Sequence, residues 1–142
     1  MAAITEIADA VTAALNEGEF SQNFEAVRHY LPTFELEEMK ELHVTVVPRG
    51  VSISLLGRVY SQFDYRIDVA IQKRFEEGSA DQLDPLMTLV EEIADFFRFK
   101  RLPGEQGPMW VHTENAPIYA QEHMEQFRQF TSLLTLTFRT QR

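Results

Sequence analysis

The sequence predicts an α+β fold, a two-layer sandwich in which two main helices pack on one face of a mixed, largely antiparallel sheet. Two segments, 4–16 and 84–100, carry apolar residues at helical spacing on one side only, so each has a single side to bury. Several other segments alternate apolar and polar residues, as half-buried strands do. The order is helix, strand, two or three strands, helix, strand and strand, which favours helices layered on a sheet. A length of 142 residues suits one domain spanning 1–142.

The two helices are the clearest elements of the sequence. The apolar stripe of the first consists of Ile4, Ile7, Val11 and Leu15. Gly18 is a natural end for this helix. The second helix is expected to begin at Asp84, a favoured N-cap residue, with Pro85 as its first helical residue. Its apolar stripe consists of Leu86, Leu89, Val90, Ile93 and Phe97.

The first half of the sheet is expected to hold several short strands. They are predicted at 23–34, 43–48, 51–55 and 65–72. The acidic residues 35–41 form a connector, and 48–50 (PRG) predict a turn or bend. Residues 57–64 (GRVYSQFD) have neither a helical nor a strand period, so they predict a protruding loop.

The second half of the chain supplies two further strands. Residues 76–83 and 102–108 are expected to be loops, because they are rich in Gly, Pro, Ser or acidic residues. Strands are predicted at 109–113 and 130–138, and a helical turn at 121–126. The strand 130–138 is expected to be central, because Leu133 interrupts its polar face.

Composition excludes several classes of protein. Thirteen basic against twenty-two acidic residues leave a net charge of −9, which disfavours general binding to a nucleic acid backbone. The chain has no cysteine, so it has no disulfide framework and no thiolate site. No apolar run is long enough for a membrane span, and the first residues do not resemble a secretory signal. These features predict a soluble protein of a reducing compartment.

The charge is unevenly distributed along the chain. Residues 76–95 hold seven acidic residues and no basic one, and residues 1–41 are also strongly acidic. Residues 42–75 are the most basic segment, with five basic and two acidic residues. The acidic blocks coincide with predicted helices and the basic ones with predicted strands, although solvated helix faces alone would give the same pattern.

No residue pattern for catalysis or cofactor binding is present. The four histidines lack the spacing of a metal site, and no glycine pattern predicts a phosphate-binding loop. Ser52 and Ser54 lack the glycines that flank a hydrolase nucleophile. Trp110 with His112 could stack on a base or a sugar, but a lone Trp more often anchors a core. We therefore predict no enzymatic activity, no cofactor and no metal.

Several short segments occur in a characteristic order along the full length of the chain. These are 7–11 (IADAV), 44–49 (VTVVPR), 64–69 (DYRIDV) with 72–73 (QK), 89–95 (LVEEIAD), 114–119 (ENAPIY) and 129–132 (QFTS). In this order of segments the whole chain resembles the tail-terminator, or neck, proteins of long-tailed bacteriophages and prophages.

The resemblance implies a small α+β structural subunit that forms a hexameric ring on the finished tail tube. Such a ring stops tube polymerisation and offers a surface to the head-tail connector protein. The implied partners are further copies of the chain, the tail tube protein and the connector, while genome DNA passes through without specific binding. The implied location is the tail-neck region of the virion, after assembly in the host cytoplasm. The family offers no catalytic residues to carry over.

Two other functions stay open. One is a neighbouring virion part, such as a head-completion or tail-tube subunit, which shares the ring architecture. The other is a cellular α+β module that binds a small ligand or acts as an enzyme, which a deep pocket with convergent polar groups would favour.

The residues expected at a subunit interface are Arg49, Arg58, Tyr60 and Phe63. Tyr, Phe and Arg are enriched in interface cores, and three of these residues lie in the segment 57–64 without a regular period. Arg49 or Arg58 is expected to meet the acidic segment 76–83 of an adjacent subunit. Alternatively, Tyr60 and Phe63 fold back onto their own sheet.

Overall fold

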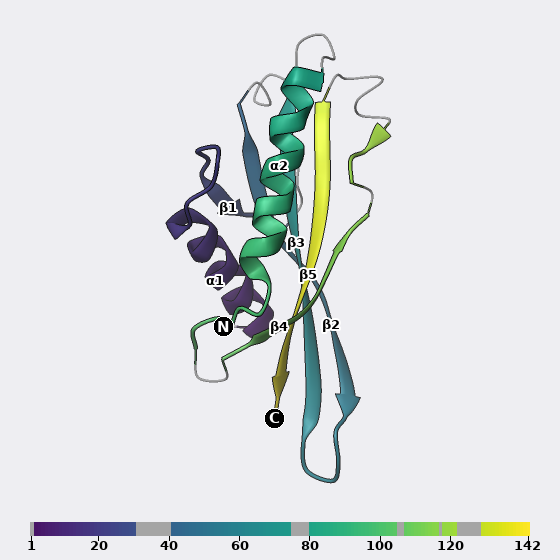
Figure 1. Cartoon of the computed structure of the whole chain (residues 1–142). Helices are drawn as coiled ribbons and strands as arrows, with labels where there is room; N and C mark the ends of the chain where they lie inside the picture. Colours follow the sequence, from purple (N-terminus) through teal and green to yellow (C-terminus); the bar gives the residue numbers. More distant parts are fainter. Residues whose placement is uncertain (1, 31–40, 75–79, 105–106, 117, 122–128) are drawn as a thin grey trace.

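The computed structural model describes residues 2–30, 41–74, 80–104, 107–116, 118–121 and 129–142. The elements are α1 (Ala3–Glu17), β1 (Ala26–Arg28), β2 (His43–Leu55), β3 (Ser61–Arg74), α2 (Ala80–Phe97), β4 (Met109–Asn115) and β5 (Gln129–Gln141). Within these residues the strands form one five-stranded sheet in the order β1-β2-β3-β5-β4. Both helices lie on the same face of the sheet (Figure 1), so the predicted α+β sandwich is confirmed.

The sheet is mixed but mostly antiparallel. β2 pairs with β3, β3 with β5 and β5 with β4 in antiparallel register, and only the short β1 runs parallel to β2. β5 therefore has a neighbouring strand on each side. This agrees with the prediction, based on Leu133, that the strand lies inside the sheet and not at its edge. The side chain of Asn16 holds β1 in place, because it bonds both the N–H and the C=O of Ala26, at 2.7 and 3.0 Å.

The core lies between the helices and the upper part of the sheet. The buried residues of α1 are Ile7, Ala8, Val11 and Leu15, and those of α2 are Leu86, Leu89, Val90, Ile93 and Phe97. They pack against buried residues of the three longest strands, which include Val44, Val46, Ile67, Val69, Ile71, Leu134, Leu136 and Phe138. The apolar stripes of both predicted helices are therefore the buried stripes.

Residues 48–50, predicted to form a turn or bend, do not reverse the chain. β2 continues through them, and the register shifts by one residue between the pairs Pro48↔Ile67 and Gly50↔Arg66, which leaves Arg49 as the extra residue of a β-bulge. Proline is tolerated at such a bulge because the ladder is already interrupted there. Pairing with β3 on both sides of the bulge keeps the strand continuous.

The predicted loop at 57–64 is too long. Ser61 to Asp64 belong to β3, because they pair with β2 on one side and with the last residues of β5 on the other. Only 56–60 form the turn, which the bond from the Leu56 N–H to the Tyr60 carbonyl closes at 2.9 Å. Gly57 has φ of 104°, a conformation that residues with a side chain rarely adopt.

α2 begins earlier and ends earlier than the sequence predicts. Pro85 lies inside the helix instead of at its first position, and residues 80–83, expected in a loop, are helical. The half-buried Leu83 packs against the core, and this packing stabilises the added first turn of the helix. The gain outweighs the loss of the one backbone hydrogen bond that Pro85 cannot donate. The helix ends at Phe97, and Phe99 at φ of 60° redirects the chain.

The predicted strand at 23–34 is reduced to Ala26–Arg28 in the described residues. The predictions for 35–40, for 76–79 and for most of 121–126 lie outside the described residues.

Candidate assembly surface

The most prominent surface feature is the end of the β2–β3 hairpin, which we call the hairpin arm and define as residues 51–60, the last residues of β2 and the turn that follows them. In Figure 1 it projects beyond both helices, and the turn at its tip projects beyond the end of β5. Val51–Leu55 form an edge of the sheet, because β3 pairs with them on one side and with the end of β5 on the other. β1 pairs only with Val44–Val46, and β5 ends where Arg142 and Ser61 exchange two backbone bonds, of 2.7 and 2.9 Å.

The arm exposes a continuous set of apolar side chains. Leu55 and Val59 are 83% and 81% exposed, and Ile53 and Tyr60 are each about three-fifths exposed. Val51 and Leu56 complete the set. Val51, Ile53 and Leu55 alternate with Ser52 and Ser54, so one face of the arm is apolar and the other polar. Contiguous exposed apolar patches of this kind mark interaction sites.

The apolar face of the arm continues into the core face of the sheet. Val51 pairs with the buried Tyr65, and Ile53 pairs with the half-buried Phe63. The Phe63 ring lies nearly parallel to that of Tyr65, with 6.2 Å between the ring centroids. The guanidinium of Arg142 lies 4.3 Å from the centre of the Phe63 ring. The arm is thus the part of the core face that α1 and α2 leave uncovered.

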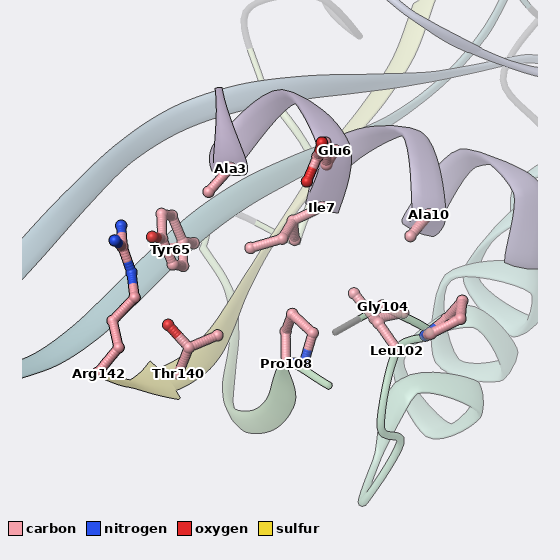
Figure 2. A pocket seen from close by; sticks show the side chains of 11 residues that line it. Ala3, Glu6, Ile7, Ala10, Tyr65, Leu102, Gly104, Pro108, Thr140 and Arg142 are labelled. Atoms are coloured by element: carbon pink, nitrogen blue, oxygen red, sulfur yellow. The ribbon is translucent and has the colours of Figure 1, made fainter. Parts of the chain in front are cut away.

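A groove of about 570 Å³ lies next to the base of the arm, between α1, the end of β5 and the segment after α2. Figure 2 shows Tyr65 and Arg142 at one end of this groove, Leu102 and Gly104 at the other, and Ile7 between them. We call it the proximal groove. Since Tyr65 and Arg142 both contact Phe63, the groove and the apolar face of the arm form one continuous surface.

The opposite face of the sheet is polar and carries two ion pairs. Arg139 donates two bonds to the Asp64 carboxylate, of 2.8 and 3.1 Å, and this hydrogen bonding raises the pKa of Arg139. Arg49 lies 3.5 Å from an Asp68 carboxylate oxygen and donates to the Thr135 hydroxyl at 3.1 Å. The Thr135 hydroxyl in turn donates to Asp68 at 2.8 Å. Both pairs are partly exposed, so each contributes little to stability.

The structure separates the four residues that the sequence places at an interface. Arg58 and Tyr60 lie exposed on the arm. Phe63 packs against Tyr65 on the sheet. The alternative that these aromatic residues fold back onto their own sheet therefore holds for Phe63 and not for Tyr60. Arg49 contacts residues of the polar face and does not join the other three.

Sequence reasoning missed the exposed apolar residues at the end of β2. Val51, Ile53 and Leu55 alternate with serines, which is also the pattern of a strand with one buried face. The pattern does not reveal that no helix covers this end of the sheet. The signal that remains in the sequence is Val59 beside Tyr60 in a turn, where apolar residues are uncommon.

A second groove, of about 840 Å³, lies at the other end of the sheet from the arm. We call it the distal groove; it is lined by Phe24, Glu25, Val27, Glu41, Leu42 and Lys73, among others. Val27 is 41% exposed, and both glutamates are exposed. The distal groove therefore combines an apolar floor with an acidic rim.

No metal centre or membrane helix is found in the part of the chain that the structure describes. No three His, Cys, Asp or Glu side chains there lie close enough together to hold a metal ion. Neither described helix is long and apolar enough to cross a membrane.

Comparisons with known proteins add no family to these observations. No protein-family model matches the chain, and no curated protein matches its sequence.

Proposed function

We propose that this chain is a structural subunit of a phage-type particle that forms a ring on the tail tube, terminates tube polymerisation and offers the surface to which the head joins. The observation that carries the proposal is the hairpin arm, whose six exposed apolar residues have no partner surface among the described residues of their own chain. Such a surface suits a protein that works by assembly.

Two further observations support a ring subunit. The arm and the distal groove lie at different ends of the molecule and have different chemistry, and a closed ring or a stack needs such unlike contacts. The order of the sequence segments that resemble tail-terminator proteins also spans the whole chain. The proposed location is the tail-neck region of the virion, with the tail tube protein and the head-tail connector protein as partners.

The decisive experiment is electron microscopy of particles assembled without this chain. We expect overlong tails or tails that are not joined to heads. Supplying the wild-type chain restores joined tails of normal length. Tails of normal length that are joined to heads in the absence of the chain would contradict the proposal.

The role of the arm is tested by supplying variants in the same assay. The double variant Leu55→Ser, Val59→Ser removes apolar area only from exposed positions, so it should fold normally and fail to restore joined tails. The matched control is Ile118→Ser, which removes an exposed apolar residue elsewhere and should restore them.

The isolated protein distinguishes the neighbouring virion parts from a terminator. A tail-tube subunit polymerises into long cylinders, whereas a terminator forms discrete rings.

A further inference from the structure

The hairpin arm and the distal groove are complementary in apolar character and in charge. The tip of the arm carries Val59 and Tyr60, which are exposed and apolar or aromatic, and the groove presents Phe24, Val27 and Leu42. Arg58, at the same tip, is exposed and forms no ion pair with any described residue, whereas the groove carries Glu25 and Glu41. Among the described residues that line the groove, Lys73 is the one lysine or arginine, whereas Glu25 and Glu41 are two acidic residues.

The two surfaces are too far apart to meet within one chain. β3 runs from Ser61, next to the turn at the tip of the arm, to Lys73 at the groove. At about 3.4 Å per residue, these twelve steps span roughly 40 Å. The turn of the arm also points away from β1, whose Val27 lines the groove (Figure 1), so any contact between the arm and the groove joins two molecules.

The groove has a suitable size for the tip of an arm. Its volume of about 840 Å³ falls in the range of pockets that enclose most of a small ligand. It therefore accommodates a few side chains of the tip, such as Val59 and Tyr60, and not the whole arm.

We propose that the tip of the hairpin arm docks into the distal groove of a second copy of this chain, so that copies join head to tail. Val59 and Tyr60 occupy the apolar floor formed by Phe24, Val27 and Leu42, and Arg58 faces Glu25 or Glu41 at the rim. The contact is heterologous, since different surfaces of the two copies meet, and it produces a closed ring if the rotation between copies closes. The inference rests on the proposed function only in treating the arm as an assembly surface.

Disulfide trapping tests this contact directly, because the chain has no cysteine of its own. Val59→Cys places a thiol at the tip of the arm, and Val27→Cys places one in the distal groove. The two variants, one carrying an affinity tag, are mixed at high concentration and oxidised, and the tagged and untagged products are separated on a non-reducing gel. We expect a Val59–Val27 heterodimer as the main product.

Two controls define a specific product. Val59→Cys mixed with Thr88→Cys, an exposed site on α2, measures random collisions. Val59→Cys mixed with Asp84→Cys tests the acidic start of α2 as the alternative partner of Arg58. The proposal is overturned if the yield of the Val59–Val27 heterodimer is no higher than the yield of either control pair. A dominant homodimer linked through position 59 overturns it as well, because it would show that two arms pair with each other.

A charge exchange tests the rim contact. Adding Arg58→Glu to the arm variant should reduce the heterodimer yield roughly two- to fivefold, as expected for an exposed ion pair. Adding Glu25→Arg to the groove variant should then restore the yield. If Glu25→Arg fails and the corresponding Glu41→Arg fails as well, Arg58 does not face this rim and the proposed docking is wrong.

The trapping result and the particle result are independent. If the heterodimer forms but particles do not need the chain, the head-to-tail contact stands and the proposed tail function is wrong. If particles need the chain but no heterodimer forms, the tail function stands and the arm binds a different protein.

Discussion

Tyr60 and Phe63 show how two aromatic residues three positions apart acquire different roles. Tyr60 lies in the turn of the hairpin arm with most of its ring exposed. Phe63 lies on β3, packed parallel to Tyr65 and covered by the Arg142 guanidinium. Stacked rings and a cation over a ring face each stabilise a fold beyond the area they bury. Phe63 therefore contributes to folding, whereas Tyr60 is available to a partner.

Single alanine substitutions should separate these two roles. Phe63→Ala should lower the free energy of unfolding by about 1–3 kcal/mol, because it removes a half-buried ring and its two contacts. Tyr60→Ala should change it by less than about 0.5 kcal/mol, as is usual for an exposed site. Urea denaturation of both variants measures the difference. Equal losses for both would mean that Tyr60 also belongs to the folded core.

At the scale of elements, the one-sided apolar stripe of α2 decides how the helix lies on the sheet. Its central residue Ile93 is fully buried, and Phe97 contacts Phe138 of β5 edge to face, with ring centroids 6.2 Å apart. The exposed residues of the helix include Thr88, Glu91 and Asp95. The helix therefore has one buried face and one solvent-exposed face, as an amphipathic helix in a two-layer sandwich must have.

Placing a charge on the buried face of α2 should abolish folding. Ile93→Asp buries a carboxylate without a partner, which costs several kcal/mol against a total stability of about 5–15 kcal/mol. The variant should be insoluble or lack a cooperative thermal transition by circular dichroism. Thr88→Asp adds the same charge on the exposed face of the same helix and should melt almost like the wild type. A soluble Ile93→Asp variant with a cooperative transition would refute this packing of α2.

For the whole molecule, the arrangement of charge matters more than its total of −9. Two arginines on the face of the sheet opposite the helices are partly compensated, because Arg139 and Arg49 pair with Asp64 and Asp68. Arg58 remains without an ion pair in the described residues. The acidic excess elsewhere disfavours tight binding to DNA, which is consistent with the proposed ring, through which a genome would pass.

The protein should therefore not bind duplex DNA at physiological salt. Fluorescence anisotropy of a labelled duplex titrated with the protein is expected to stay unchanged up to micromolar protein. A dissociation constant tighter than roughly 10⁻⁶ M would exceed ordinary non-specific binding. Such a value would indicate a DNA-binding surface and contradict this interpretation of the charge.

The sequence by itself determined the fold class, both main helices and the central strand, because periodicity reports which side of an element is buried. Ile93 and Leu134 could be placed in the core on this basis, and both are fully buried. Local signals were less reliable where pairing partners decide the outcome. The Pro-Arg-Gly at 48–50 was predicted to turn the chain, yet β3 holds it in one strand as a bulge. Asp84 and Pro85 were predicted to begin a helix, yet the packing of Leu83 extends it to Ala80.

Only the tertiary structure decided which apolar residues have no cover. Val51, Ile53 and Leu55 alternate with serines just as Val44 and Val46 alternate with neighbours of the other face, and the sequence treats the two sets alike. The difference is that α1 and α2 both end before the hairpin arm, which is a property of lengths and directions in space. Likewise, the arm and the distal groove lie at opposite ends of β2 and β3. This separation follows from the topology of the sheet, and no local sequence pattern reveals it.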